Sequence, residues 1–244
     1  MLATEGDLRL DGLVKRYPGF TLGPVETTVP CGVTALLGAN GAGKTTLMRL
    51  IVGTTPPTSG KVHLPRGGVF ANVGFLPQDF TAPPRVSAQD YLMFVAWCLS
   101  TRRAKITSNQ VSEALDAVGL ASKAGSRIGA LSGGMLRRLG VAQTLLGGSH
   151  LLVLDEPTVG LDPIQRQDMR ELITQLGERA VVLMSTHLAE DVVAVAKQVL
   201  VLDGGAVAYD GTVGGLCGGR AISSQSLEAG FLQLVRDKGR ADAV

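Results

Sequence analysis

The sequence predicts an α/β fold on a mostly parallel sheet, with antiparallel strands near the N-terminus and an inserted α-helical subdomain. Three observations predict it: short aliphatic runs alternate with helical segments, a glycine-rich loop joins one run to a helix, and residues 87–148 are helical in character. Parallel strands need crossover connections, which are usually helices. Ligands of such sheets bind at the carboxyl ends of the strands, where functional residues are therefore expected.

The bulk properties fit one large globular domain. The chain has 244 residues, of which 45% are hydrophobic and 18% charged, a composition that excludes a disordered chain. The net charge is +2 without a basic cluster, so no nucleic-acid partner is expected. The three cysteines, Cys31, Cys98 and Cys217, have neither the spacing of a metal site nor a disulfide pattern. This pattern fits a protein of the reducing cytosol.

No segment predicts a membrane span or a secretion signal. The longest aliphatic and aromatic run, Tyr91–Leu99, is about half of the roughly 18 apolar residues that a spanning helix needs. The N-terminal residues carry no apolar signal region. We therefore expect a protein that is soluble by itself, so any membrane role would require a separate subunit.

The first part of the chain predicts strands around one short helix. Residues 8–17 alternate as a strand does, and the helix begins at Lys44 after the glycine-rich loop and ends before Gly53. The other strands are expected at Val33–Leu37, Lys61–Leu64 and Val73–Leu76.

The middle part predicts helices. Ser87 and Asp90 resemble a capping box that precedes the apolar segment 91–99. Apolar residues at helical spacing indicate a second helix that Gly119 ends; these are Val111, Leu115 and Val118.

The last part returns to strands and helices. Strands are expected at Leu151–Leu154 and Ala180–Met184, and Asp162 followed by Pro163 favours the start of a helix between them. That helix has one apolar face, formed by Leu172, Ile173 and Leu176. Residues 198–202 and 206–211 predict a hairpin with its turn at Asp203-Gly204.

The glycine-rich loop has the spacing of a phosphate-binding loop. Residues 38–45, GANGAGKT, follow a predicted strand and open a helix, as this motif requires. Glycines allow backbone N–H groups to turn toward phosphate oxygens, and the helix N-terminus adds a partial positive charge. Lys44 is expected to reach the β- and γ-phosphates, and the Thr45 hydroxyl to hold Mg²⁺.

Two acids follow a buried strand. After Leu151–Leu154, Asp155 can orient Mg²⁺ through water, and Glu156 can polarise an attacking water as a general base. A strand that merely ends at a polar loop would show the same pattern, so this interpretation depends on the phosphate-binding loop.

A second phosphate-binding element begins at Ser132. The sequence Leu131-Ser132-Gly133-Gly134-Met135 precedes a helical segment, and offers a hydroxyl, two backbone amides and a positive helix end. By itself, it equally fits an ordinary capped helix. One nucleotide rarely needs two such elements from one chain, which implies a second chain.

Three further residues are candidates for the nucleotide site, although each is weak evidence by itself. His187 follows a strand and the Ser185-Thr186 pair, where it could contact a γ-phosphate. Gln78, also after a strand, could reach Mg²⁺ and the attacking water. Tyr17 could stack on adenine, although a half-buried structural tyrosine would look the same.

Together and in this order, these residues resemble the ATP-binding-cassette (ABC) family over nearly the whole chain. The matching motifs are the adenine-stacking Tyr17, Walker A GANGAGKTT, the Q-loop Gln78, the signature LSGGM, Walker B LLVLDE, the D-loop GLDP with Asp162, and the switch His187. The resemblance implies a RecA-like ATP-binding core at 1–84 and 150–204, a helical signature subdomain at 85–149, and a C-terminal hairpin and tail at 205–244. Met135 departs from the family's usual glutamine, which puts one polar contact toward the partner's nucleotide in doubt.

The resemblance also implies site roles. Catalysis is assigned to Lys44, Gln78, Glu156 and His187, and Mg²⁺ binding to Thr45, Gln78 and Asp155. ATP binding is assigned to Tyr17, Gly38, Ala39, Asn40, Gly41, Ala42, Gly43, Lys44, Thr45 and Thr46. Ser132, Gly133 and Gly134 are expected to bind ATP in trans, on the partner of a head-to-tail dimer with two sandwiched ATP molecules.

The implied partners are a second ATP-binding subunit, in a homodimer, and a separate integral-membrane permease at the cytoplasmic face of a bacterial membrane. The segments SGGMLRRLGVAQTLLGG, DEPTVGLDP and SLEAGFLQLV resemble ATPase subunits of ABC-2-type exporters such as drug-export systems. An importer subunit is the alternative. A soluble ABC ATPase acting on ribosomes or DNA and a GTP switch protein fit less well, because the chain has one phosphate-binding loop, no heptads and no guanine-reading motif.

Overall fold

A computed structural model describes residues 6–65, 73–100 and 105–241, with side chains as far as residue 236. Its strands are β1 (Leu8–Tyr17), β2 (Phe20–Val29), β3 (Gly32–Leu37), β4 (Ser59–His63), β5 (Val73–Leu76), β6 (Leu151–Asp155), β7 (Val181–Ser185), β8 (Gln198–Asp203) and β9 (Ala206–Thr212). Its helices are α1 (Lys44–Val52), α2 (Ala88–Leu99), α3 (Ser108–Ala117), α4 (Gly133–Leu145), α5 (Pro163–Gly177), α6 (Ala189–Val195), α7 (Val213–Leu216) and α8 (Ser224–Ala241).

The strands form two sheets. The larger has the order β5-β6-β7-β3-β8-β9, in which all neighbours are parallel except the antiparallel edge strand β9. The smaller sheet, β2-β1-β4, is antiparallel. The predicted α/β class is therefore confirmed, including the antiparallel strands near the N-terminus.

The central strands are buried on both faces. Along β6, Leu151 and Val153 pack with α1 and the small sheet, whereas Leu152 and Leu154 pack with the helices of the opposite face. Successive side chains of a strand point to opposite faces, so a strand covered on both sides is apolar throughout. This accounts for the uninterrupted aliphatic runs in the sequence.

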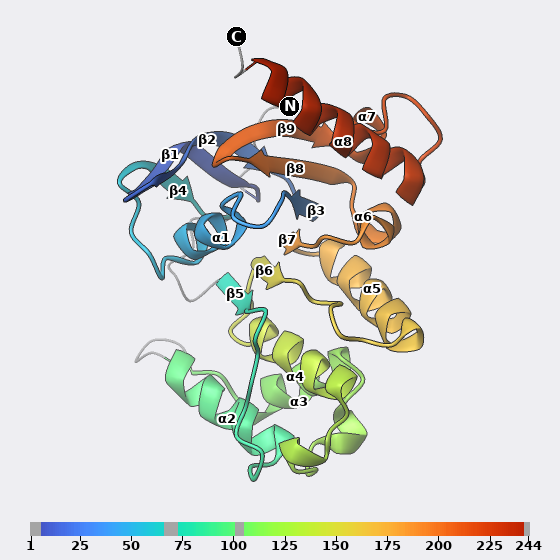
Figure 1. The fold of residues 1–244 in the computed structure, drawn as a ribbon. Helices are drawn as coiled ribbons and strands as arrows, with labels where there is room; N and C mark the ends of the chain where they lie inside the picture. The colour runs from blue at the N-terminus through green and yellow to red at the C-terminus, as the bar shows by residue number, and fades with distance from the viewer. Residues whose placement is uncertain (1–5, 66–72, 101–104, 242–244) are drawn as a thin grey trace.

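Helices α2, α3 and α4 lie together at one end of the molecule, beyond β5, and α8 lies at the other end beside β9 (Figure 1). The predicted helical segment 85–149 contains α2, α3 and α4. The predicted boundary at 204 falls in the turn between β8 and β9, and β9 pairs antiparallel with β8 as the edge strand of the main sheet.

Two local predictions need correction. Ser87 does cap α2 by accepting from the Asp90 N–H, but its hydroxyl also donates to the Asp90 carboxylate at 2.6 Å, so there is no reciprocal capping box. The reciprocal box lies at Thr107 and Gln110, at the start of α3. A glutamine side chain at this third position is long enough to reach back to the cap N–H.

The turn of the β8–β9 hairpin is the second correction. Asp203 pairs with Ala206, so the central turn residues are Gly204 and Gly205, one position later than predicted. Their φ angles are 55° and 86°, the left-handed values that a tight hairpin turn requires and that glycine adopts without strain.

The C-terminal helix α8 packs its apolar residues Leu227, Phe231 and Leu234 onto a cluster that includes β3, β8 and α6. Among the described helices, none has both the length and the apolar character needed to cross a bilayer.

Candidate functional site

The glycine-rich loop joins the end of β3 to the start of α1, at the carboxyl edge of the large sheet. Gly43 is the N-cap of α1 with φ 106°, and no side chain caps the helix. A Cβ at Gly38 would lie 2.4 Å from the Leu202 carbonyl oxygen, so only glycine fits there. The first backbone N–H groups of α1 have no intrahelical partner and are available to an anion.

A cavity of about 220 Å³ lies against this loop, lined by Phe20, Ala39, Gly41, Gly43, Lys44, Thr45 and Thr46. The Lys44 Nζ donates to the carbonyl oxygens of Gly38 at 2.6 Å and Ala39 at 3.1 Å. Burial lowers the pKa of Lys44 below its usual value, while the carboxylates of Glu156 and Asp155 oppose this shift. The lysine and both acids therefore share one electrostatic environment.

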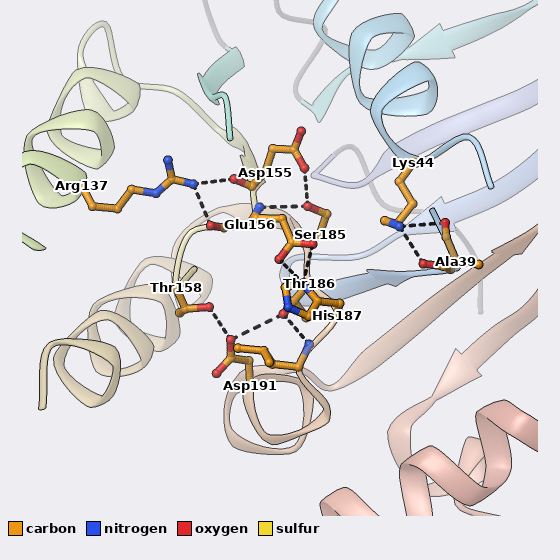
Figure 2. Close-up of polar contacts among 12 residues, drawn as sticks. Ala39, Lys44, Arg137, Asp155, Glu156, Thr158, Ser185, Thr186, His187 and Asp191 are labelled. Carbon is orange, nitrogen blue, oxygen red and sulfur yellow. Dashed lines mark hydrogen bonds and ion pairs between the residues drawn. The ribbon is translucent and has the colours of Figure 1, made fainter. Parts of the chain in front are cut away.

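The two acids end β6 beside the last residue of β7. Parallel pairing places Asp155 opposite Ser185. The Ser185 hydroxyl donates to Asp155 Oδ1 at 2.5 Å and accepts from the Glu156 N–H at 2.9 Å (Figure 2). One serine thus fixes the carboxylate of the first acid and the backbone of the second.

Glu156 is in a strained conformation. Its φ of 49° makes it the single non-glycine residue with positive φ in the described part of the chain. Such conformations cost of order 1–3 kcal/mol and persist where surrounding contacts impose them. Here the N–H is held by Ser185, and the carboxylate oxygens lie 3.1 Å from Nδ1 of His187 (Figure 2).

A buried carboxylate joins the segments on either side of this site. Asp191 in α6 is 0% exposed and accepts from Arg170 in α5, from the Thr158 hydroxyl and, at 3.5 Å, from the Thr186 hydroxyl. Thr158 follows Glu156 by two residues, and Thr186 precedes His187 (Figure 2). Sequence reasoning missed Asp191, because nothing local distinguishes it from an exposed helical acid.

Replacing Asp191 with Ala should destabilise the fold. The change leaves Arg170, which is 16% exposed, without its main partner, and removing one member of a buried pair costs about 3–5 kcal/mol. We expect a loss near the lower figure, because Glu190 still contacts Arg170 at 3.4 Å. Urea denaturation measures it. Glu190→Ala is the control: Glu190 is 66% exposed, so its loss should cost less than about 1 kcal/mol. Equal midpoints for the two variants would contradict the prediction.

The other predicted residues lie apart from this cluster. Ser132 caps α4 by accepting from the Met135 N–H at 3.2 Å, and Gly133 is exposed. Within the described ranges, no hydrogen bond or ion pair joins residues 132–134 to the loop 38–46. Asp162 caps α5, with its carboxylate accepting from the Gln165 N–H at 2.8 Å.

Gln78 and Tyr17, two further predicted residues, are exposed. The Gln78 side chain is exposed after β5, at the same edge of the sheet as β6. Tyr17 is 41% exposed at the β1–β2 turn, with Lys15 Nζ 5.5 Å from its ring centre, whereas Phe20 lines the cavity. Phe20 gave no signal in the sequence, because it is one more apolar residue in a strand.

The described side chains include no group of three or more His, Cys, Asp or Glu residues that could hold a metal ion. The residues predicted to bind Mg²⁺ offer three different groups: the hydroxyl of Thr45, the amide of Gln78 and the carboxylate of Asp155. This sparse set suits Mg²⁺, which commonly binds through one or two protein oxygens together with substrate phosphates and water.

The fold and this site define a P-loop nucleotide-binding protein. A family model described as "ABC transporter" matches residues 22–159, more than half of the chain, and the chain therefore belongs to the ABC transporter ATP-binding family. The match includes the glycine-rich loop, the signature segment and both acids.

Two relatives agree with this assignment. The chain is 38% identical over 179 residues to the ABC transporter ATP-binding protein YxlF of Bacillus subtilis, covering 72% of this chain and 60% of YxlF. It is 36% identical over 180 residues to the Nod factor export ATP-binding protein I of Rhizobium etli, covering 70% of this chain and 56% of that protein. The chain thus spans less than two thirds of either relative.

A solved ATP-binding subunit of an ABC transporter superimposes with a TM-score of 0.78 and 21% identity, covering 93% of this chain and 98% of the other. At this identity, the likeness confirms the fold.

Proposed function

We propose that this chain is the ATP-hydrolysing subunit of an ABC exporter, and that it closes with a second ATP-binding subunit to drive a separate membrane permease. One observation carries the proposal. The loop with Lys44 follows β3, and Asp155, Glu156 and His187 lie at the ends of the neighbouring parallel strands β6 and β7, so they share one edge of the sheet as one half-site. Among the described residues, no hydrogen bond or ion pair joins the exposed signature residue Ser132 to this half-site.

Within the half-site, each residue has a distinct task. Lys44 and the free N–H groups at the start of α1 bind the β- and γ-phosphates. Glu156 accepts a proton from the water that attacks the γ-phosphorus, and His187, held against Glu156, contacts the γ-phosphate. Mg²⁺ would be held by Thr45, Gln78 and, through water, Asp155, and would neutralise phosphate charge.

The separated signature requires a second subunit. Ser132, Gly133 and the N-terminus of α4 offer donors and positive potential, but in the described part of the chain no hydrogen bond or ion pair joins them to the loop that carries Lys44. ATP between the two subunits would supply that phosphate. Shifting a dimer from 1:99 to 99:1 closed takes about 5.5 kcal/mol of preferential binding. Hydrogen bonds to charged groups contribute about 1.5–3 kcal/mol each, so a few contacts in trans suffice.

Export rests on sequence likeness. The relatives include a protein named for Nod factor export, and the resemblance to ABC-2-type exporters covers the signature helix and the tail. The permease would hold the subunit at the cytoplasmic face of the membrane. Co-purification of a membrane protein from detergent-solubilised membranes, with ATP turnover that responds to it, tests this part.

Ser132→Arg tests whether ATP is bound between two subunits. The new side chain adds bulk and positive charge where the partner's γ-phosphate would bind, so closure should be blocked while each chain still binds nucleotide. We expect turnover to fall about 100-fold, because several charge-assisted contacts are lost together. The dissociation constant of a fluorescent ATP analogue should change less than about twofold, since the Lys44 loop is untouched.

Ser122→Arg is the matched control, because Ser122 is also an exposed serine of the helical segment. It should keep wild-type turnover and ATP-dependent dimerisation on a sizing column. Normal turnover in Ser132→Arg would show that the signature takes no part in ATP hydrolysis.

A further inference from the structure

The guanidinium of Arg137 uses all five of its N–H donors on backbone carbonyls of two separate loops. Nη1 donates to Pro77 O at 3.0 Å and Gln78 O at 2.7 Å, in the loop after β5. Nη2 donates to the carbonyls of Asp155, the last residue of β6, at 2.6 Å and of Glu156 at 2.7 Å. Nε donates to the carbonyl of the next residue, Pro157, at 3.3 Å. Figure 2 shows Arg137 reaching from α4 to the second loop.

The arginine is an unusual group to bury. Arg137 is 8% exposed, and the described residues give its side chain carbonyl partners without a paired carboxylate. Burial lowers the pKa of Arg137, and the nearby acids Asp155, Glu156 and Asp79 work in the opposite direction. A buried charge is costly unless its donors are satisfied. Here every donor is satisfied, so the cost is offset by contacts that fix the two loops.

The two loops carry different parts of the proposed site. Gln78 lies in the first and Glu156 in the second, and Arg137 holds the Glu156 carbonyl while Ser185 holds its N–H. Both hydrogen bonds act on the residue whose φ is positive. Arg137 itself lies on α4, the helix that begins with the signature.

We infer that Arg137 is a positioning residue that ties the Gln78 loop and the strained Glu156 backbone to the signature helix. The inference rests on the proposed function, since it assumes that these loops act on ATP. Movement of α4, such as docking of its N-terminus on a partner's phosphate, is thereby transmitted to the backbone of both loops. The hydrogen-bond partners of Arg137 among the described residues include none of the glycine-rich loop 38–45, so we expect Arg137 to act on turnover rather than on ATP binding.

Arg137→Lys is the test, because it keeps the charge and most of the apolar stem. The three donors of a lysine all lie on its Nζ atom, so a lysine cannot reproduce the planar guanidinium that reaches five carbonyls. We expect kcat to fall about 10- to 100-fold, because small misplacements of catalytic groups lower rates by this order. KM for ATP and the affinity for a fluorescent ATP analogue should stay within about twofold.

Amide hydrogen exchange supplies a readout that does not depend on activity. In Arg137→Lys, exchange should rise in residues 78–80, 155, 156, 158 and 159 and stay unchanged in the rest of the described chain. A general loss of stability would raise exchange across the core instead.

Arg138→Lys is the matched control on the same helix. Arg138 bonds to Asp168 at 2.6 Å and to the Val118 carbonyl at 3.4 Å, and touches neither loop. Its variant should keep wild-type kcat and exchange in both loops.

The outcomes are separable. Wild-type kcat in Arg137→Lys, an equal loss in Arg138→Lys, or exchange that rises uniformly would overturn the inference. Should Arg137→Lys not fold, Arg137→Gln receives the same measurements, and failure of both to fold would make the residue structural only, which also overturns it. If the wild-type protein hydrolyses no ATP, the proposed function fails, whereas the exchange pattern still decides whether Arg137 holds the two loops.

Discussion

Replacing Glu156 with Gln should nearly stop ATP hydrolysis while leaving ATP binding intact. The amide keeps the size of the side chain and can still accept from Nδ1 of His187, which lies 3.1 Å from the carboxylate. It cannot take a proton from water, and general-base catalysis contributes about 10²- to 10⁴-fold to the rate. We therefore expect turnover to fall within that range. Phosphate release measures it.

The same variant should accumulate the closed state. With hydrolysis blocked, the γ-phosphate continues to link the two subunits, so ATP should shift the protein to a dimer on a sizing column. Glu178→Gln is the control, because Glu178 is an exposed acid at the end of α5. Turnover above about a tenth of the wild-type rate, or a variant that stays monomeric with ATP, would contradict the role of Glu156 or the sandwich.

Most strands of the large sheet could be predicted because burial on both faces produces aliphatic runs. The predicted range Val73–Leu76 matches β5, and the helix at 44–52 matches α1 because glycines mark both of its ends. The bounds of β2 were not predicted. Its alternation is interrupted by Gly23 and Pro24, residues that ordinarily argue against a strand.

The proximity of the predicted site residues could be foreseen where a rule of sheet geometry applied. Residues at the carboxyl ends of neighbouring parallel strands meet, which brings Asp155 and Glu156 to Ser185 and His187. Arg137 and Asp191 follow no such rule. Arg137 bonds to carbonyls 18 to 60 residues distant in the chain, and Asp191 bonds to a threonine 33 residues away. Backbone carbonyls occur at every residue, so the sequence contains no mark of which ones an arginine will reach.

Lys44→Ala should reduce turnover about 10²- to 10³-fold with little loss of stability. Among the described residues, its Nζ bonds to carbonyls of its own loop alone, Gly38 and Ala39, and such bonds contribute about 0.5–1.5 kcal/mol each. By contrast, among the described side chains that line the loop cavity, Lys44 is the one that carries a positive charge, so nothing there replaces it against the β- and γ-phosphates. Removing one such electrostatic contact typically costs about 10²- to 10³-fold in rate.

Comparing Lys44→Ala with Lys61→Ala separates a role in the site from a general effect of lost charge. Lys61 is an exposed lysine of β4, and its variant should keep wild-type turnover. Lys44→Arg should lose turnover as well, because a wide planar guanidinium does not fit a loop shaped around a compact ammonium group. Phosphate release and the thermal midpoint are measured on all three variants. Since the midpoint of Lys44→Ala should stay close to wild type, lost turnover at unchanged stability places the lysine on the phosphates. Retained turnover would instead remove the phosphate-binding role of this loop, and with it the proposed ATPase.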